Sequence, residues 1–546
     1  MNKVASYLQS HLSGEVLADE HVRQQFATDA SPLSIMPSLV VYPRTTNDIR
    51  KIARFSWQLA ERGHKLPLTV RGGGSDWTGA AIGRGVIIAM SAHLKNILEL
   101  DTKQKLVRVQ PGVNFKSLQE TLHTHGLFLP PEPESSGYST IGGAIANNAS
   151  GRQSFTYGDM SAWVDRLEVV LANGEVIQTG PLSKRDVSKK LGLPTLEGEL
   201  YRAVDTLLND EADTMSAYAR AINASSDNVG YRLSQLRVKG GGLDLTQLFV
   251  GAQGTLGIIT EAIMKCAAYV PASSLVVAAF ENMDDALSAA EGLAKLKPTA
   301  LELVDGELLD YTRRHLNVEL PTELMIGDKS GILLFAEASN RSDRDLNRFT
   351  KRAEKVCSEF TDTCMVATDF ESREKLWAYR YQTAGFMAYQ NNRRLGIPLL
   401  AGVSVPPAAL HQFVQDTKTL FTKHHIEGAV VVHAQSNEVL AIPSLDLARL
   451  GDRQLVFKLL EEYFAHVIKL GGSIATTSSE GRLRAPYSVS QTGSDLMTVF
   501  QQLKTAADPH TMLNPEVKIA MDTKALVEAL RKDYSLDAFA QFLPRI

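Results

Sequence analysis

Cysteine is scarce in this chain. Among 546 residues only Cys266, Cys357 and Cys364 are cysteines, and no two of them form a Cys-x-x-Cys pair. Because an iron–sulfur cluster is normally held by four thiolates, the chain is not expected to carry a cluster of its own. We expect the three thiols to lie in the core or on the surface.

Long apolar runs and an excess of charge are missing as well. No uncharged run approaches the roughly 18 apolar residues of a membrane-spanning helix, and residues 1–8 lack the apolar region of a secretion signal. The net charge of −4 and the pI near 6.4 give no basis for a nucleic-acid partner. We therefore expect a cytoplasmic protein without a transmembrane segment, and peripheral attachment to a membrane stays open.

The composition suits a globular protein of two or three domains, with 44% hydrophobic and 22% charged residues. Leu8, Leu12, Val16 and Leu17 recur near helical spacing, so residues 1–35 are expected to form a helical lead-in. Strands and helices then alternate over residues 36–268, and a second series over residues 269–492 is typical of an antiparallel sheet covered by helices. Residues 493–546 are predicted to be helical. The predicted strands include 68–70, 86–90, 106–109, 167–171, 274–280, 300–304 and 331–335, and the predicted helices 283–295 and 344–359.

Three consecutive glycines, Gly72 to Gly74, follow the strand-like run 66–70. Glycine allows positive φ and carries no Cβ, so successive backbone N–H groups of such a loop can converge on a diphosphate. Arg71 and Ser75 flank the triplet and could add donors. A glycine run on its own is more often an ordinary turn.

A second segment, residues 130–148, favours the binding interpretation. Prolines 130, 131 and 133 stiffen an extended chain and prevent pairing in a central strand. Ser135, Ser136 and Thr140 offer hydroxyl groups just before Gly142 and Gly143, where backbone can approach a flat ring.

These segments resemble, in order and spacing, the FAD-binding domain of the vanillyl-alcohol oxidase / p-cresol methylhydroxylase superfamily, and most closely its FAD-linked D-2-hydroxyacid dehydrogenases. That group includes D-lactate, glycolate and D-2-hydroxyglutarate dehydrogenases. Further matching motifs lie at Asn228–Leu233, Asp244–Glu261 and Leu513–Pro515, so the resemblance runs from about Ala27 to Met521. It implies an α+β fold with a two-part FAD-binding domain of p-cresol methylhydroxylase type, completed by residues 493–546, and an α+β cap domain that binds the substrate.

The resemblance also implies a noncovalently bound FAD, since Ser75 stands where some superfamily members carry a histidine linked to the flavin. The cofactor residues implied by the matching motifs are Arg71, Gly72, Gly73, Gly74, Ser75, Asp76, Pro131, Glu132, Ser135, Ser136, Thr140, Gly142, Gly143, Ala146, Asn147, Gly254, Ile258, Ile259 and Asn514.

The catalytic pattern of the family is interrupted. In the related dehydrogenases two histidine-containing segments supply metal ligands and a catalytic base, and here they align with residues 433–440 and with Thr476 to Ser478. Only His433 remains, because Leu440, Thr477 and Ser478 stand at the other positions. These side chains suit neither a transition metal nor proton abstraction, so we expect no metal. His433 is the best remaining base and Tyr487 a weaker one, although a hydrogen-bonded core histidine is about equally compatible with residue 433.

The family's cap uses an arginine and a lysine to hold a substrate carboxylate, and Arg380 and Arg394 occupy those positions. A guanidinium can bind a carboxylate through two hydrogen bonds where an ammonium acts as a point charge. Arg482 and Arg484 lie in the motif expected to face the flavin and could also orient the anion. For each single arginine, a solvated surface position is the alternative.

The leading hypothesis is an FAD-dependent oxidoreductase that oxidises a small carboxylate-bearing substrate, such as a D-2-hydroxy acid. Hydride would pass to FAD and the electrons to a separate acceptor, either a quinone, a flavoprotein or an iron–sulfur protein. A homodimer is left open. The alternative is a flavin-binding subunit or sensor that has lost dehydrogenase activity.

Overall fold

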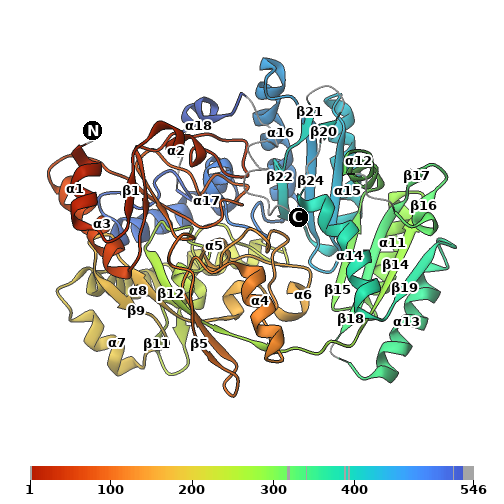
Figure 1. Cartoon of the computed structure of the whole chain (residues 1–546), viewed down its shortest axis with the longest axis horizontal. Coiled ribbons are helices and arrows are strands. Elements are labelled where there is room, and N and C mark those ends of the chain that lie inside the picture. The colour runs from red at the N-terminus through yellow and green to blue at the C-terminus, as the bar shows by residue number, and fades with distance from the viewer. Residues whose placement is uncertain are drawn as a thin grey trace.

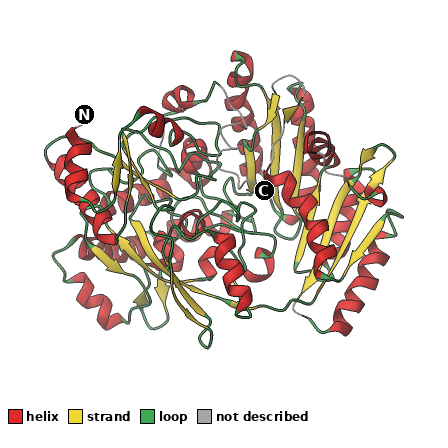
Figure 2. Cartoon of the chain, in the orientation of Figure 1, coloured by secondary structure: helices red, strands yellow, loops and turns green. Residues whose placement is uncertain are grey.

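The computed structural model describes residues 3–316, 320–339, 341–385, 389–390, 394–519 and 522–532. The elements of the N-terminal half lie on one side of the molecule and a large sheet from the second half lies on the other (Figure 1). Both sides mix helices with strands (Figure 2). The α+β class predicted from the sequence is confirmed.

The first sheet has the strand order β1-β2-β4-β3. β2 (Leu39–Tyr42) and β3 (Leu68–Arg71) both pair in parallel with β4 (Val86–Ala89), and α3 (Thr46–Glu61) lies between β2 and β3 in the chain. α3 begins where Thr45 accepts a hydrogen bond from the backbone N–H of Asp48. The chain leaves the carboxyl end of β3 directly into the glycine loop.

The prediction of an all-helical lead-in over residues 1–35 is wrong in one element. α1 (Lys3–His11) and α2 (Glu20–Gln25) are helices, but Val16 and Leu17 lie in β1 (Glu15–Leu17), which pairs antiparallel with β2. Gly14 permits this pairing, because a Cβ there would lie 2.0 Å from the carbonyl oxygen of Tyr42. The edge of β2 supplies hydrogen-bond partners that local periodicity does not reveal.

The second sheet is antiparallel, with the order β5-β6-β12-β8-β9. Its strands are β5 (Ile97–Asp101), β6 (Leu106–Val109), β8 (Val164–Val170), β9 (Val176–Gln178) and β12 (Ile258–Lys265). The remaining elements of this half are α4 (Phe115–Thr124), β7 (Leu127–Phe128), α5 (Ile141–Asn147), α6 (Ser154–Tyr157), α7 (Lys184–Leu191), α8 (Leu196–Asp210), α9 (Ala212–Ala221), β10 (Arg237–Val238), β11 (Gly242–Leu243), α10 (Thr246–Phe249) and β13 (Ala267–Ala268).

The cap is built on one antiparallel sheet with the order β19-β14-β18-β15-β23-β24-β21-β20, and β22 also pairs with β24. Its strands are β14 (Ser273–Phe280), β15 (Ala300–Val304), β18 (Ile332–Ser339), β19 (Cys364–Ala367), β20 (Tyr389–Gln390), β21 (Arg394–Gly396), β22 (Leu400–Ser404), β23 (Gly428–His433) and β24 (Glu438–Leu445). A small hairpin, β16 (Met325–Ile326) and β17 (Lys329–Ser330), lies beside them.

Helices cover both faces of the cap sheet. Val276 and Ala278 of β14 pack in one apolar core and Leu275 and Val277 in another, as expected for alternating side chains. The first core includes α11 (Met283–Ala294), α13 (Asp343–Cys357), α15 (Leu410–Lys423) and α16 (Leu450–Lys469), and the second includes α12 (Gly306–Leu316) and α14 (Phe370–Gly385). Burial on both faces explains why β14 reads as a continuous apolar run.

The C-terminal part of the chain returns to the first sheet. α17 (Gly481–Ala507) is kinked at Gly493, where φ is 76°, so the expected boundary at residue 493 falls at a break within one helix. After α17 the chain runs beside β3, where the N–H of Leu68 donates to the carbonyl of Met512 at 2.7 Å. α18 (Thr523–Ala529) follows. Within the described ranges, no helix combines the length and hydropathy needed to cross a bilayer.

Candidate functional site

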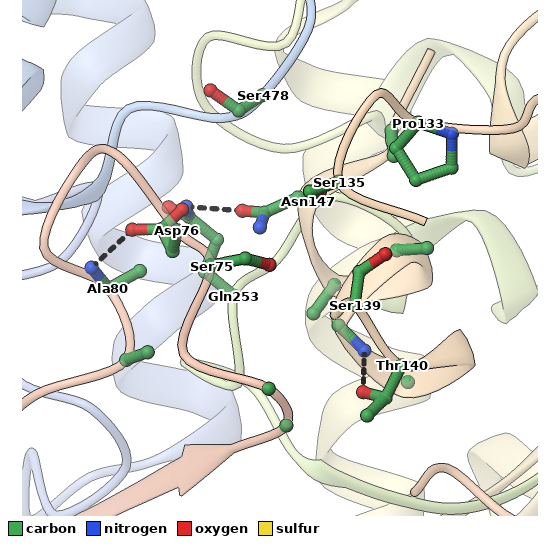
Figure 3. Close-up of a pocket in the computed structure, with 18 of the residues that line it drawn as sticks. Ser75, Asp76, Ala80, Pro133, Ser135, Ser139, Thr140, Asn147, Gln253 and Ser478 are labelled. Atoms are coloured by element: carbon green, nitrogen blue, oxygen red, sulfur yellow. Dashed lines mark hydrogen bonds between the residues drawn. The ribbon is translucent and has the colours of Figure 1, made fainter. Parts of the chain in front are cut away.

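A cavity lies where the glycine loop after β3, the segment leading into α5, and the β23–β24 hairpin of the cap meet. Figure 3 shows its wall, with Ser75 and Asp76 from the glycine loop opposite Ser139 and Thr140. The predicted cofactor residues that line it are Gly72, Gly73, Gly74, Ser75, Asp76, Ser135, Thr140, Gly142, Gly143, Ala146, Asn147, Gly254, Ile258 and Ile259. His433, Leu440, Thr477 and Ser478 line it as well, so the aligned catalytic segments face the predicted cofactor loops.

The loop needs glycines mainly because atoms of a neighbouring loop lie very close to its backbone. Only Gly74 of the triplet has a positive φ, at 74°. A Cβ on Gly73 would lie 1.9 Å from the carbonyl oxygen of Tyr138, and a Cβ on Gly72 would lie 2.2 Å from Oγ1 of Thr140. The two loops therefore pack in direct contact, and of the two properties of glycine, the lack of a Cβ is the one that Gly72 and Gly73 use.

Two predicted cofactor residues, Arg71 and Asn514, lie outside the cavity wall and form hydrogen bonds with neighbouring backbone. Arg71 is buried, and its Nη1 donates to the carbonyl of Thr28 at 2.7 Å. Asn514 donates to the carbonyls of Ala80 and Gln253 at 2.9 and 2.8 Å. Neither side chain lines the cavity. Their direct contact with a cofactor, predicted from motif position, finds no support in this geometry.

Three further predicted residues do not line this cavity. Glu132 and Ser136 line a neighbouring cavity of about 530 Å³, and Pro131 belongs to neither lining set. The neighbouring cavity shares Ser75, Trp77, Glu134 and Ser135 with the first. The two cavities therefore adjoin.

The wall fits a polar ligand with a flat ring, as FAD is. The hydroxyl oxygens of Ser139, Thr477 and Ser478 are buried in the wall and have no hydrogen-bond partner among the described residues. Since buried polar groups normally have partners, they are placed to bond a ligand. The glycine loop adds close backbone on the opposite side. Residues on this surface thus suit the cofactor implied by the sequence motifs.

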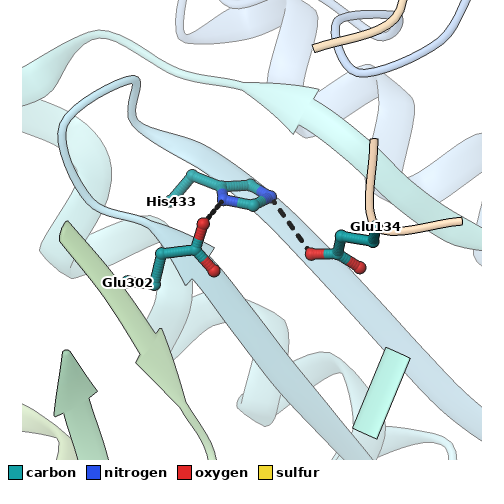
Figure 4. Close-up of side chains that lie close together, drawn as sticks. All are labelled: Glu134, Glu302 and His433. Carbon is teal, nitrogen blue, oxygen red and sulfur yellow. Dashed lines mark hydrogen bonds and ion pairs between the residues drawn. The ribbon is translucent and has the colours of Figure 1, made fainter. Parts of the chain in front are cut away.

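A charged cluster lies at the cap end of the cavity. Glu302 of β15 and His433 of β23 are cross-strand partners, and Nδ1 of His433 lies 2.9 Å from Oε1 of Glu302. Glu134, from the loop before α5, approaches the other side of the ring, with Oε1 at 3.7 Å from Nε2 (Figure 4). Arg380 of α14 donates through Nε to Glu302 at 2.5 Å and through Nη2 to Glu134.

The carboxylates fix the charge of His433. Burial opposes the imidazolium, but Glu302 and Glu134 outweigh it and raise the pKa of His433 to about 9. Burial likewise opposes ionisation of Glu302, yet Arg380 and His433 lower its pKa to about 2. Both groups are therefore charged at neutral pH. This disfavours the predicted role of His433 as a base near pH 7.

The cluster does not fit a divalent metal. Glu134, Glu302 and His433 are ligand types that metals accept, and their ligand atoms lie within 4.8 Å of one another. However, the guanidinium of Arg380 already bonds both carboxylates and places a positive charge where a metal cation would have to bind. Leu440 and Thr477, from the aligned ligand segments, add no strong donor. The arrangement is an ion-pair network.

Glu438 is a further carboxylate beside His433. A continuous strand would place the two side chains on opposite faces. The chain instead turns between β23 and β24, so that His433 and Glu438 are direct cross-strand partners. Burial raises the pKa of Glu438, while His433 opposes this shift.

Arg482, Arg484 and Tyr487 do not border the cavity. Arg482 donates to the carbonyl of Gly79 at 2.6 Å, and Arg484 donates to that of Ile474 at 3.0 Å. Both guanidinium groups are 1% exposed, and burial lowers each pKa to about 10. Tyr487 packs edge-on against Phe464. Their predicted roles as anion ligands and base are not supported by this placement, and the alternative of solvated arginines is wrong too.

Arg394 lies in β21, between β24 and the edge strand β20 of the cap sheet, but its side chain is outside the described residues. Two acids that the cluster depends on were missed. Glu134 stands within a segment recognised only for its prolines and hydroxyls, and Glu302 interrupts the apolar run of a predicted strand. A carboxylate in such a strand requires a buried cation, and that was the available signal.

Comparisons with known proteins agree on both halves of the chain. The FAD binding domain matches residues 37–180, and the C-terminal domain of FAD linked oxidases matches residues 271–517. The D-2-hydroxyglutarate dehydrogenase of Pantoea ananatis is 28% identical over 92% of this chain, but the chain spans only 50% of that protein. Glycolate oxidase subunit GlcD of Bacillus subtilis is 28% identical, with 93% of this chain and 95% of the relative covered.

The structure of p-cresol methylhydroxylase with bound substrate shares the fold. It aligns with a TM-score of 0.68 at 15% identity, over 95% of this chain and 96% of the other. The predicted two-part FAD-binding fold with a cap domain is thereby confirmed. The chain belongs to the FAD-linked oxidases, with an FAD binding domain followed by the C-terminal domain of that family.

Proposed function

We propose that this protein is an FAD-dependent oxidoreductase that oxidises a small carboxylate-bearing substrate, such as a D-2-hydroxy acid, and passes the electrons to a separate acceptor. The observation that carries the proposal is the shared cavity, in which loops 72–76 and 139–147 face His433 of the cap. Relatives named as D-2-hydroxyglutarate dehydrogenase and glycolate oxidase subunit support the substrate class.

FAD would be held noncovalently by the glycine loop and the segment into α5. Ser75 offers no imidazole for a covalent link. When bound, the flavin supplies a two-electron acceptor for hydride. With three cysteines in the chain, an iron–sulfur cluster that takes up the electrons would have to belong to another protein. The separate acceptor would be a quinone, a flavoprotein or such an iron–sulfur protein.

Arg380 and His433 would bind the substrate carboxylate. Both carry positive charge at neutral pH and lie beside the cavity wall, and Glu302 bonds to both and fixes their orientation. Buried charge-assisted hydrogen bonds of this kind hold an anion more firmly than neutral ones. At neutral pH this assigns His433 to substrate binding in place of proton abstraction.

The hydroxyl proton of the substrate then needs another route. The hydroxyl groups of Thr477 and Ser478 lie in the cavity wall, find no partner within the described part of the chain, and can pass a proton to water. Neutral His433 would be available only near and above pH 9. Turnover should consequently be slow at pH 7 and increase toward alkaline pH.

The charged state of His433 also favours the alternative, a flavin-binding subunit or sensor without dehydrogenase activity. A site with both cations paired and no neutral imidazole can bind a flavin and an anion without oxidising it. The two functions differ in whether substrate reduces the flavin.

Anaerobic reduction of the purified holoprotein decides between them. D-lactate, glycolate and D-2-hydroxyglutarate should bleach the flavin absorbance, faster at about pH 9 than at pH 7, and L-lactate serves as the stereochemical control. Absence of bleaching by every acid at either pH would refute the oxidoreductase and favour the subunit or sensor.

A further inference from the structure

Among the described residues, the ion-pair network at the cap end of the cavity is balanced without a substrate. It joins two carboxylates, Glu134 and Glu302, to two cations, Arg380 and His433. Arg380 is 1% exposed, and its guanidinium is shared between both carboxylates. An added anion would therefore enter a buried site whose positive charge is already balanced, which is unfavourable.

The two carboxylates are not equivalent. Glu302 is fixed within the cap sheet, and its side chain is 3% exposed. Glu134 comes from the other half of the molecule, on a loop where it directly follows Pro133, and its side chain is 14% exposed. Glu134 and His433 line the cavity, whereas Arg380, bonded to Glu134, lies behind the wall. The carboxylate of Glu134 thus stands between Arg380 and the cavity.

We propose that, in the free protein, the carboxylate of Glu134 occupies the anion-binding position beside Arg380, which we call the seat. Glu134 must leave this position when a substrate carboxylate binds. The inference rests on the proposed function in taking Arg380 as the seat. Once Glu134 has moved toward the adjoining cavity, which it also lines, the other described members of the network, Arg380, His433 and Glu302, carry one net positive charge. That charge matches a monocarboxylate.

Glu134 would therefore determine specificity. It competes with every carboxylate that enters, so weak monoanions fail to displace it unless further contacts compensate. A substrate with a second polar group on the wall, such as a 2-hydroxyl, gains those contacts. A purely structural role for Glu134, as a latch between the cap and the FAD-binding half, predicts the opposite effect of its removal.

Calorimetric titration of the FAD-loaded protein with acetate separates the two roles. Glu134→Gln keeps the shape and removes the competing charge, so acetate should bind about tenfold more tightly or better. Acetamide, which has the same shape without the charge, should bind equally to both proteins. Glu371→Gln is the matched control, because Glu371 is an exposed acid on the same helix as Arg380 and lines neither cavity, and it should leave acetate affinity unchanged.

Unchanged or weaker acetate binding by Glu134→Gln would overturn the proposal and leave Glu134 as a latch. Glu134→Asp gives a second measurement if the glutamine variant does not fold. Its shorter side chain reaches Arg380 less well, so acetate should bind several-fold more tightly, and unchanged affinity would again overturn the proposal. Tighter acetate binding without flavin bleaching by any hydroxy acid would refute the proposed oxidation and still support the seat.

Discussion

Glu302→Gln should change the charge of His433. The two side chains share a hydrogen bond of 2.9 Å across neighbouring strands. Burial alone would lower the pKa of His433, whereas Glu302 contributes most to raising it from 6.5 to about 9. Glutamine preserves the shape and removes the charge, so we expect the pKa of His433 to fall below neutrality in the variant.

The size of the effect follows from linkage. A histidine whose pKa is higher in the folded than in the unfolded chain stabilises the fold fully below about pH 6.5, and the contribution disappears as the pH rises through about 9. A rise of this extent corresponds to roughly 3 kcal/mol of unfolding free energy. Glu302 itself, with its pKa lowered to about 2, stays ionised throughout this window. The wild type should therefore lose roughly 3 kcal/mol relative to the variant between about pH 6.5 and 10.

Two measurements test this reasoning. NMR titration of isotope-labelled histidine gives the pKa of His433, and urea unfolding across the same pH range gives the stability difference. Asp416→Asn is the control, because it removes the carboxylate 2.9 Å from His466, a pair that is about one-third exposed, and exposed pairs contribute little. A wild-type His433 that titrates near its ordinary pKa would refute the charge assignment, and with it the anion-binding role.

Four further outcomes follow. Gly73→Val should abolish most FAD binding, because its Cβ would lie 1.9 Å from the Tyr138 carbonyl oxygen. Gly451→Val should retain FAD, because a Cβ there meets no neighbouring atom within 4 Å. Equal flavin content in the two variants would place the FAD-binding loop elsewhere. Arg484→Lys should lower the unfolding free energy by roughly 2 kcal/mol through lost carbonyl bonds while leaving the KM unchanged, and a raised KM would return Arg484 to the substrate site. Acid precipitation should release FAD into the supernatant, and a yellow pellet would show covalent attachment. Elemental analysis should find well under one transition metal per flavin, and a stoichiometric, chelator-sensitive metal would contradict the ion-pair assignment.

Much of the fold could be predicted because many strands are buried on both faces. The apolar run predicted as strand 274–280 is β14 (Ser273–Phe280), and the helix predicted over 283–295 is α11 (Met283–Ala294). Such elements can be predicted from local composition and periodicity. β1 does not, because three residues at the edge of another strand carry no periodicity of their own.

The cofactor wall could be anticipated from its motifs, but the physical reason for its glycines could not. Gly73 is required by the carbonyl of Tyr138, which lies on a different loop. The arginines show the same limit. Motif position placed Arg482 and Arg484 by the flavin, while their carbonyl partners at Gly79 and Ile474 become neighbours only through tertiary folding.

The charged cluster depends on separations that no local pattern spans. Glu134 and Arg380 are 246 positions apart, and Glu302 and His433 are 131 apart. The cross-strand pairing of β15 with β23 brings Glu302 to His433, and packing of the cap against the loop before α5 adds Glu134. Each carboxylate keeps a cation charged in a buried position, where either cation alone would be costly. The proposed anion-binding position and one ion-pair contact between the two halves thus use the same four side chains, so a ligand that displaces Glu134 also breaks an ion pair between the FAD-binding half and the cap.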